Sequence, residues 1–132
     1  MDKIKVYKKE FLNSDYYIIT TMLDGKEDNE SVCGTHYSHS YSTELVSLLE
    51  AINEVLKSWD GTEVDMHYDY EDHDCECCGW FQDDTYTFTY KNRTLFDFFF
   101  DGHFGHSRTP DIKDIEKAYK GIVGIELDLS EF

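Results

Sequence analysis

The sequence predicts an α+β fold, in which one mostly antiparallel sheet is covered by two helices within a single domain. Three observations predict it. Short alternating apolar segments lie on both sides of one long helical pattern. The chain has 132 residues, and aromatic residues make up 16% of it, which is too many for a disordered acidic chain. We expect residues 1–132 to share one core, since this length suits one domain.

Three strands are predicted before residue 40. Residues 3–9 alternate between apolar and lysine side chains, which is a strand pattern. Residues 15–22 are rich in Tyr, Ile and Thr, which favour strands, and Asp24-Gly25 then indicates a turn. Residues 31–37 are expected to form the third strand.

Residues 42–59 form the clearest predicted element. Apolar side chains recur there at helical spacing and form one stripe: Leu45, Leu48, Leu49, Ile52, Val55, Leu56 and Trp59. Asp60-Gly61 is expected to end this helix. Three acidic residues, Glu44, Glu50 and Glu54, are expected to solvate its outer face.

Four more strands and a short helix are predicted in the second half of the chain. Residues 63–70 alternate strictly, and residues 80–90 and 95–101 are expected to pair across a turn. Thr109-Pro110 is typical of a helix start, and Gly121 is expected to close that helix. Residues 122–129 form the last predicted strand.

Acidic residues are concentrated in one half of the chain. The formal net charge is −16, and residues 27–90 hold 16 acidic residues against one basic residue, Lys57. The rest of the chain holds 12 acidic and 11 basic residues and is nearly neutral. A field of one sign repels nucleic acids and anionic membranes and attracts basic surfaces. We therefore expect no direct binding to nucleic acid or membrane, and a basic protein as the partner.

The four cysteines are expected to be reduced or metal-bound. No apolar run has the length of a signal or a membrane span, so the expected compartment is the cytoplasm, where disulfides are rare. Cys75 and Cys78 have the two-residue spacing of a zinc knuckle. The preferred ligands for a structural zinc ion are Cys33, His73, Cys75 and Cys78. Alternative ligands are Cys77, His67 and His36.

The sequence favours a protein without enzymatic activity. It contains no His-Glu-x-x-His pattern, and no glutamate stands where a zinc deaminase needs its general acid. It also lacks a phosphate-binding glycine loop, and a thiolate-rich zinc site is usually closed to substrate. The pair His103 and His106 more often belongs to a surface loop than to a metal site.

Taken together, the short length, the strong acidity, the many Tyr and Asp residues and the cysteine–histidine cluster resemble a phage anti-CRISPR protein of the type II-A class. The cluster of His73, Cys75, Cys77 and Cys78 is similar to the metal site of a zinc-containing member of that group. The resemblance implies an inhibitor that acts in the bacterial host cell during phage infection. It would bind a Cas9-type effector, whose channel holds nucleic acid through backbone charge, and prevent engagement of target DNA.

The expected partner-binding surface contains the acidic residues Glu63, Asp65, Asp69, Glu71, Asp72 and Asp74. Aromatic anchors are expected beside them, with Tyr37, Tyr41, Tyr68 and Tyr70 as candidates, because charge alone seldom gives tight binding. A different class of protein fits the same composition: an acidic immunity protein that neutralises a basic nuclease toxin. A zinc-stabilised adaptor with no nucleic-acid-binding partner is a third interpretation.

Overall fold

The computed structural model describes residues 2–12, 14–23, 26–35, 41–77, 79–102 and 107–132. Within these ranges it leaves out the side chains of residues 11, 14, 15, 23, 27–29, 31–35, 41–43, 60 and 75. The strands are β1 (Lys3–Phe11), β2 (Ser14–Leu23), β3 (Lys26–Thr35), β4 (Asp65–Cys75), β5 (Gly79–Tyr90), β6 (Arg93–Phe100), β7 (Ser107–Arg108) and β8 (Glu126–Asp128). The helices are α1 (Tyr41–Asp60) and α2 (Ile112–Ala118), and a π-helical turn, η1 (Tyr119–Val123), continues α2.

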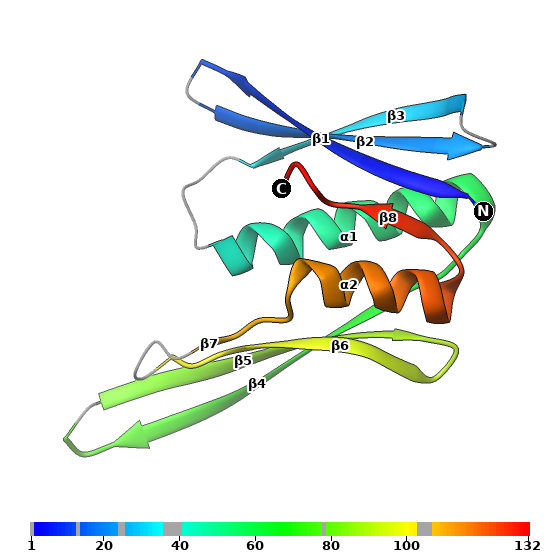
Figure 1. Ribbon diagram of the computed structural model, residues 1–132. Coiled ribbons are helices and arrows are strands. Elements are labelled where there is room, and N and C mark those ends of the chain that lie inside the picture. The colour runs from blue at the N-terminus through cyan, green and yellow to red at the C-terminus, as the bar shows by residue number, and fades with distance from the viewer. Residues whose placement is uncertain (1, 13, 24–25, 36–40, 78, 103–106) are drawn as a thin grey trace.

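The elements form three layers, with the two helices between two sheets (Figure 1). Sheet A has the strand order β3-β2-β1-β8, and sheet B has the order β4-β5-β6-β7. All the pairs are antiparallel except β1 with β8, which is parallel. The predicted α+β class and the mostly antiparallel pairing are confirmed. The strands are divided between two sheets, whereas the sequence predicted one.

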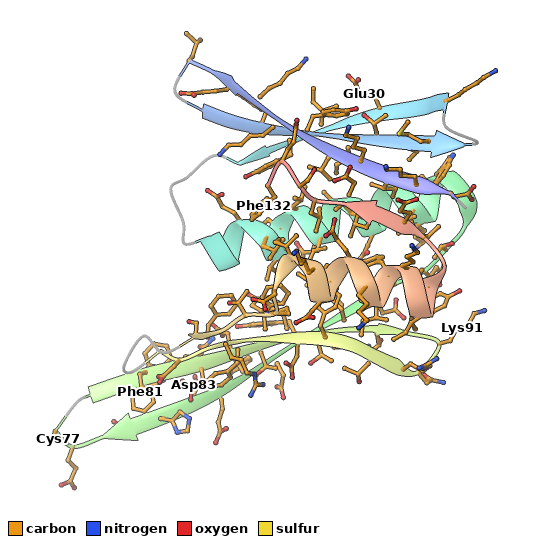
Figure 2. All side chains as sticks on the ribbon, in the orientation of Figure 1. Glu30, Cys77, Phe81, Asp83, Lys91 and Phe132 are labelled. Carbon is orange, nitrogen blue, oxygen red and sulfur yellow. The ribbon has the colours of Figure 1, made fainter. Side chains whose placement is uncertain are left out.

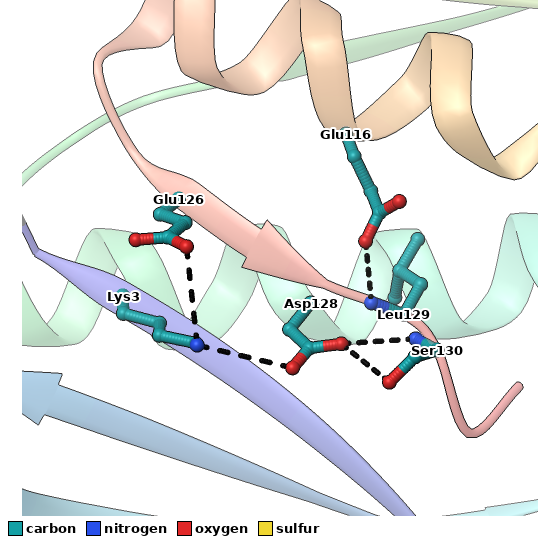
Figure 3. Close-up of polar contacts among 6 residues, drawn as sticks. All are labelled: Lys3, Glu116, Glu126, Asp128, Leu129 and Ser130. Carbon is teal, nitrogen blue, oxygen red and sulfur yellow. Dashed lines mark hydrogen bonds and ion pairs between the residues drawn. The ribbon is translucent and has the colours of Figure 1, made fainter.

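The C-terminal strand returns the chain to the sheet in which it began. Lys3 on β1 lies 3.9 Å from both Glu126 and Asp128 on β8, and these ion pairs fasten the parallel strands together (Figure 3). The carboxylate of Glu116 on α2 accepts a hydrogen bond from the backbone N–H of Leu129 at 3.0 Å. Sheet A, β8 and α2 are thereby joined by side-chain contacts as well as by apolar packing.

One hydrophobic core spans all three layers. Helix α1 contributes the predicted stripe, of which Leu45, Leu48, Leu49, Ile52 and Leu56 are fully buried. Sheet A contributes residues such as Ile4 and Ile19, and sheet B contributes Phe88, Phe96 and Phe98. A helix between two sheets is buried over a wide arc, and α1 also buries apolar Val46 and polar Asn53 beside the predicted stripe.

A buried hydrogen bond connects the two helical segments. The hydroxyl of Tyr119 donates to Asn53 Oδ1 at 2.7 Å, and the Tyr119 side chain is completely buried. Burial raises the pKa of Tyr119 well above its usual value, although the hydrogen bond to Asn53 partly offsets the rise. The hydroxyl therefore stays protonated at neutral pH and remains a donor there.

The short elements near α2 differ from their predicted positions. The residue that caps α2 is Asp111, in extended conformation, so the helix starts two residues after the predicted first residue, Pro110.

Strand β4 continues through the predicted zinc-knuckle segment to Cys75 instead of ending at Tyr70. Among the described residues, no helix is long and apolar enough to cross a membrane.

Replacing Tyr119 with phenylalanine should destabilise the protein by about 1–3 kcal/mol, because it leaves the buried Asn53 carbonyl without its donor. Urea unfolding of the Tyr119→Phe variant and the wild type measures this difference. The Tyr16→Phe change, at a partly exposed tyrosine, is the control and should cost less than about 0.5 kcal/mol. Equal stabilities of Tyr119→Phe and wild type would show that the hydrogen bond contributes nothing.

Candidate functional site

The hairpin of β4 and β5 extends past the ends of both helices (Figure 1). Its strands have 11 and 12 residues and stay paired from Asp65–Thr89 to Cys75–Gly79. We call the distal part, residues 68–75 with their partners 79–86, the hairpin arm. Cys77 lies at its tip (Figure 2). The arm is therefore a two-stranded projection with two faces.

The register assigns each side chain of the arm to one face. Residues that are directly opposite each other in antiparallel strands point to the same side of the sheet. Met66 pairs with Phe88, and Phe88 pairs with Phe96, so this side of sheet B faces the core. We call it the inner face. Along the arm the inner face continues through the pairs Tyr68–Tyr86, Tyr70–Asp84, Asp72–Gln82 and Asp74–Trp80.

The inner face becomes exposed where the helices end. Phe88 and Phe98 are fully buried, whereas Tyr68, Tyr70 and Trp80 are 47%, 56% and 66% exposed. These three are among only four large hydrophobic residues that are exposed in the described part of the chain. Together with Tyr86 and Phe100 they form what we call the distal aromatic surface. Exposed aromatic side chains gathered on one face are typical of a protein-binding site.

Ring contacts connect this surface to the core. Phe98 stacks on Phe100 at a centroid distance of 6.5 Å, and Phe100 meets the edge of Tyr86 at 5.7 Å. Tyr86 contacts Tyr68 at 5.0 Å, and Tyr68 contacts Tyr70 at 6.1 Å. A continuous row of rings thus runs from a buried residue to an exposed one. Such a row holds the outer rings in position before any partner arrives.

Hydrogen bonds fix the central tyrosine of the row. Tyr68 donates its hydroxyl hydrogen to Asp84 Oδ1 at 2.6 Å. Gln82 Nε2 donates to the same carboxylate at 2.7 Å and to the Tyr68 hydroxyl oxygen at 3.0 Å. The bond to Asp84 is the main cause that raises the pKa of Tyr68 to about 12. Asp84 is therefore held in a defined position beside the aromatic rings.

A groove lies between the first turns of α1 and the inner face of sheet B. Its volume is about 390 Å³, and it is lined by Val46, Ser47, Glu50, Asp84, Tyr86 and Phe100. Burial raises the pKa of the Glu50 carboxyl, and the neighbouring charge of Glu54 raises it further. Burial also raises the pKa of Tyr86, with smaller contributions from Asp84 and Glu50. The groove combines two aromatic rings with two carboxylates.

The opposite, outer face of the arm is more polar. His73 stacks on Phe81 at 4.8 Å, and its Nε2 lies 3.0 Å from Asp83 Oδ2 without the geometry of a hydrogen bond. The other oxygen of Asp83 accepts the backbone N–H of Gly102 at 3.0 Å. Glycine is required at position 102, since a Cβ atom there would overlap the backbone carbonyl of Gln82. These contacts hold the chain after β6 against β5.

The six acidic residues expected to bind a partner do not share one face. The alternation of β4 places Asp65, Asp69 and Glu71 on the outer face and Asp72 and Asp74 on the inner face. All five are exposed, and Glu63 is exposed just before β4 begins. The arm is therefore acidic on both sides, and only its inner side also carries the distal aromatic surface.

The arm also has an open edge, because β4 is the outermost strand of sheet B. The backbone N–H of Tyr70 donates to the carboxylate of Asp69 at 2.9 Å. Charged side chains along an edge strand discourage pairing with a second copy of the same strand. The acidic residues of β4 thus oppose pairing of this edge with a second copy of the strand.

The predicted zinc ligands fall in two parts of the molecule. His73 and Cys75 lie two residues apart on β4, at positions that belong to the same face of the strand, close to the tip. Cys33 pairs with Tyr17 in sheet A, which lies beyond the helices from sheet B, so the structure does not bring Cys33 to the arm. The alternatives Cys77, at the tip, and His67, on β4 just before the arm, are both exposed. Cys78, His36, and the pair His103 and His106 lie outside the described residues, as do the side chains of Cys33 and Cys75.

The described side chains form no group of three or more His, Cys, Asp or Glu residues able to hold a metal ion. Since several predicted ligands are not among those side chains, zinc remains a prediction from the spacing of the cysteines. Of the predicted aromatic anchors, Tyr68 and Tyr70 lie on the distal aromatic surface. Tyr37 and the Tyr41 side chain lie outside the described part.

Sequence reasoning did not identify Trp80, Tyr86, Phe100 and Asp84 as parts of the site. Their shared face follows from the register across three strands, and only the alternation within each strand was a signal for it. Sequence reasoning also assigned Glu50 to the solvated face of α1. Glu50 is exposed, but it lines the groove, and no local pattern links a helix residue to Asp84 on a distant strand.

Replacing Asp84 with asparagine should lower the pKa of Tyr68 from about 12 toward the ordinary value near 10, because the charged acceptor is lost. NMR titration of tyrosines labelled at Cζ, with Tyr68 assigned by a Tyr68→Phe variant, measures this shift. Asp72→Asn is the control with the same charge change on the same face. An unchanged Tyr68 pKa in Asp84→Asn would contradict the hydrogen-bonded arrangement.

Comparison with known proteins provides no relative for this chain: no protein-family model matches it, and no curated protein or solved structure is significantly similar to it.

Proposed function

We propose that this protein is an inhibitor that docks the hairpin arm onto a basic surface of a nucleic-acid-binding protein. The observation that carries the proposal is the set of exposed aromatic side chains Tyr68, Tyr70 and Trp80 within a segment that has no lysine or arginine. Residues 60–84 contain 10 acidic residues and neither lysine nor arginine. The partner loses access to nucleic acid because the arm occupies the same positively charged surface.

The charge of the arm supports this choice of partner. A concentrated negative field accelerates the approach to a positive surface and repels nucleic acid, so it selects for proteins that bind nucleic acid rather than for nucleic acid itself. The basic residues of the chain lie elsewhere, for example Lys3, Lys5, Lys8 and Lys9 on β1. In sheet B, Arg93 begins β6 at the end away from the arm, and Arg108 on β7 pairs with Asp97 at 3.3 Å, so the arm itself contains no lysine or arginine.

The aromatic side chains supply the binding free energy that surface charges do not. Rim charges mainly change the rate of association, whereas partly buried Trp and Tyr side chains supply most of the binding free energy. Tyr68 is already held by Asp84 and by its neighbouring rings, so little conformational entropy is lost when a partner covers it. The arm therefore offers both steering and anchors in one segment.

A Cas9-type effector is the partner that the resemblance to type II-A anti-CRISPR proteins implies. Its channel must accept the backbone of a guide–target duplex, so an acidic arm that enters the channel prevents engagement of target DNA. A basic nuclease toxin offers a similar surface, and an immunity protein for such a toxin is the alternative. Both functions use the same arm and require no catalysis by this chain.

Binding assays against two panels distinguish the functions. Guide-loaded type II-A Cas9 orthologues form the first panel and basic nuclease toxins form the second. We expect the purified protein to reduce binding of target DNA by at least one Cas9 orthologue in a mobility-shift assay. Inhibition of a toxin with no effect on any Cas9 would instead identify this chain as an immunity protein. Absence of binding to both panels would overturn the proposed function.

Charge reversal on the two faces of β4 should have unequal effects. Asp72→Lys with Asp74→Lys alters the inner face, and Asp69→Lys with Glu71→Lys alters the outer face by the same charge. We expect both pairs to slow association, because both reduce steering. Only the inner pair should also speed dissociation, because it lies beside the aromatic anchors. Surface plasmon resonance with the inhibited partner measures both rates.

The control for charge alone is Glu10→Lys with Glu54→Lys, which makes the same change at two exposed positions outside the arm. It should reduce the association rate less than either pair on β4. If all four β4 residues are reversed, the chain stays folded, and binding at low salt is unchanged, the arm is not the docking surface.

The proposal includes a structural zinc ion at the tip of the arm. Two thiolates and an imidazole from Cys75, Cys78 and His73 form a donor set that suits zinc. A metal there would close the end of a two-stranded projection that has few apolar contacts of its own. Bound zinc supplies folding free energy, so its removal should loosen the arm before the core.

Metal analysis should find about one zinc ion per chain, and Cys78→Ser should remove it. Cys33→Ser is the informative comparison, because β3 lies in the other sheet. We expect this variant to keep its zinc and the Cys78→Ser variant to melt at a lower temperature. Wild-type protein from zinc-supplemented growth that contains no zinc would show the metal prediction to be wrong.

A further inference from the structure

We infer that the groove between α1 and the arm is an arginine-binding pocket, which receives one guanidinium group from an extended segment of the partner. The inference rests on the proposed function and specifies how the same surface recognises its partner. The pocket consists of the rings of Tyr86 and Phe100 and the carboxylates of Glu50 and Asp84. Its occupant is an arginine of another protein.

The lining residues match the chemistry of a guanidinium group. This group is planar, so it stacks on aromatic rings, and its five N–H donors reach carboxylates on more than one side. Tyr86 and Phe100 both line the groove, and their ring planes are nearly perpendicular, at 85°. Asp84 is held by Gln82 and Tyr68, and it keeps its second oxygen, Oδ2, outside that network.

The charge of the pocket excludes other occupants. No ion pair with a lysine or arginine reaches Glu50 or Asp84 within the described part of the chain. The partial burial of Glu50 beside Glu54 is unfavourable for its charged form, and a bound cation would relieve that cost. A second copy of this chain would bring a net charge of −16, so long-range repulsion opposes self-association.

Arginine is favoured over lysine for physical reasons. An ammonium group is compact and strongly hydrated, so it loses more hydration when it enters a partly buried site, and it cannot stack as a plane. Cation–π contacts become stronger when the cation is desolvated. The groove volume of about 390 Å³ lies at the small end of the range for ligand sites, which suits one side chain rather than a folded element.

The exposed rings beyond the pocket extend the binding surface along the arm. Tyr68 and Tyr70 continue the aromatic row away from Tyr86, and Asp72 and Asp74 follow on the same face. An extended segment with one arginine in the pocket therefore lies first over the rings of Tyr68 and Tyr70 and then over the carboxylates of Asp72 and Asp74. Arginine-rich segments of nucleic-acid-binding proteins carry the planar, positively charged groups that such a surface would bind.

The test uses the full chain and two synthetic peptides, octa-arginine and octa-lysine, which carry equal charge. Calorimetric titration at physiological salt should show octa-arginine binding at least about fivefold more tightly, since stacking is available only to arginine. The variants Glu50→Gln and Phe100→Leu should each reduce this preference. Glu10→Gln is the matched control, with the same change at an exposed position on β1 in sheet A, and should retain it.

The possible results separate the two proposals. Equal affinity of both peptides, lost alike in high salt, would overturn the arginine pocket and leave the electrostatic docking arm intact. No measurable binding of either peptide, even at low salt, would contradict both proposals. A preference that persists unchanged in Glu50→Gln and in a folded Phe100→Leu variant would show that arginine is recognised elsewhere. The Glu50→Gln variant alters only an exposed helix position, so the test remains valid if Phe100→Leu does not fold.

Discussion

The hairpin of β4 and β5 is longer than the helical layer that covers its inner face, and the properties of the candidate site follow from that mismatch. Near the helices the inner face is closed by α1 and α2, and Phe88 and Phe98 are fully buried there. Further out the same strand pattern continues without a covering layer. Tyr68, Tyr70 and Trp80 are exposed because nothing described in the fold reaches them, while their strands remain paired.

The exposed arm remains ordered because its interactions are local. The row of rings connects it to Phe98, and the hydrogen bonds among Tyr68, Gln82 and Asp84 replace the packing that a helix would have supplied. Acidic residues on both faces of β4 keep this apolar surface soluble and prevent the edge from pairing with another copy. In the proposed function the same charges attract a basic partner, so one set of acidic residues serves both solubility and recognition.

The sequence predicted what depends on local spacing. The stripe of α1 was evident because Leu45, Leu49, Ile52 and Leu56 repeat at the period of a helix, and the alternation of residues 63–70 predicted β4. Distant pairing was not predictable: β8 joins β1 across most of the chain, which divides the strands between two sheets. After Tyr70 the alternation of polar and apolar residues no longer indicated which face of the strand is which, because acidic residues occur on both faces.

Hydrogen–deuterium exchange on the complex with the inhibited partner tests the central claim most directly. The account predicts that binding slows exchange in residues 66–74 and 80–86 of the arm and in the first turns of α1, where the groove lies. Exchange in sheet A, with its basic strand β1, should be unchanged. Protection confined to sheet A, with the arm still exchanging as in the free protein, would contradict the account.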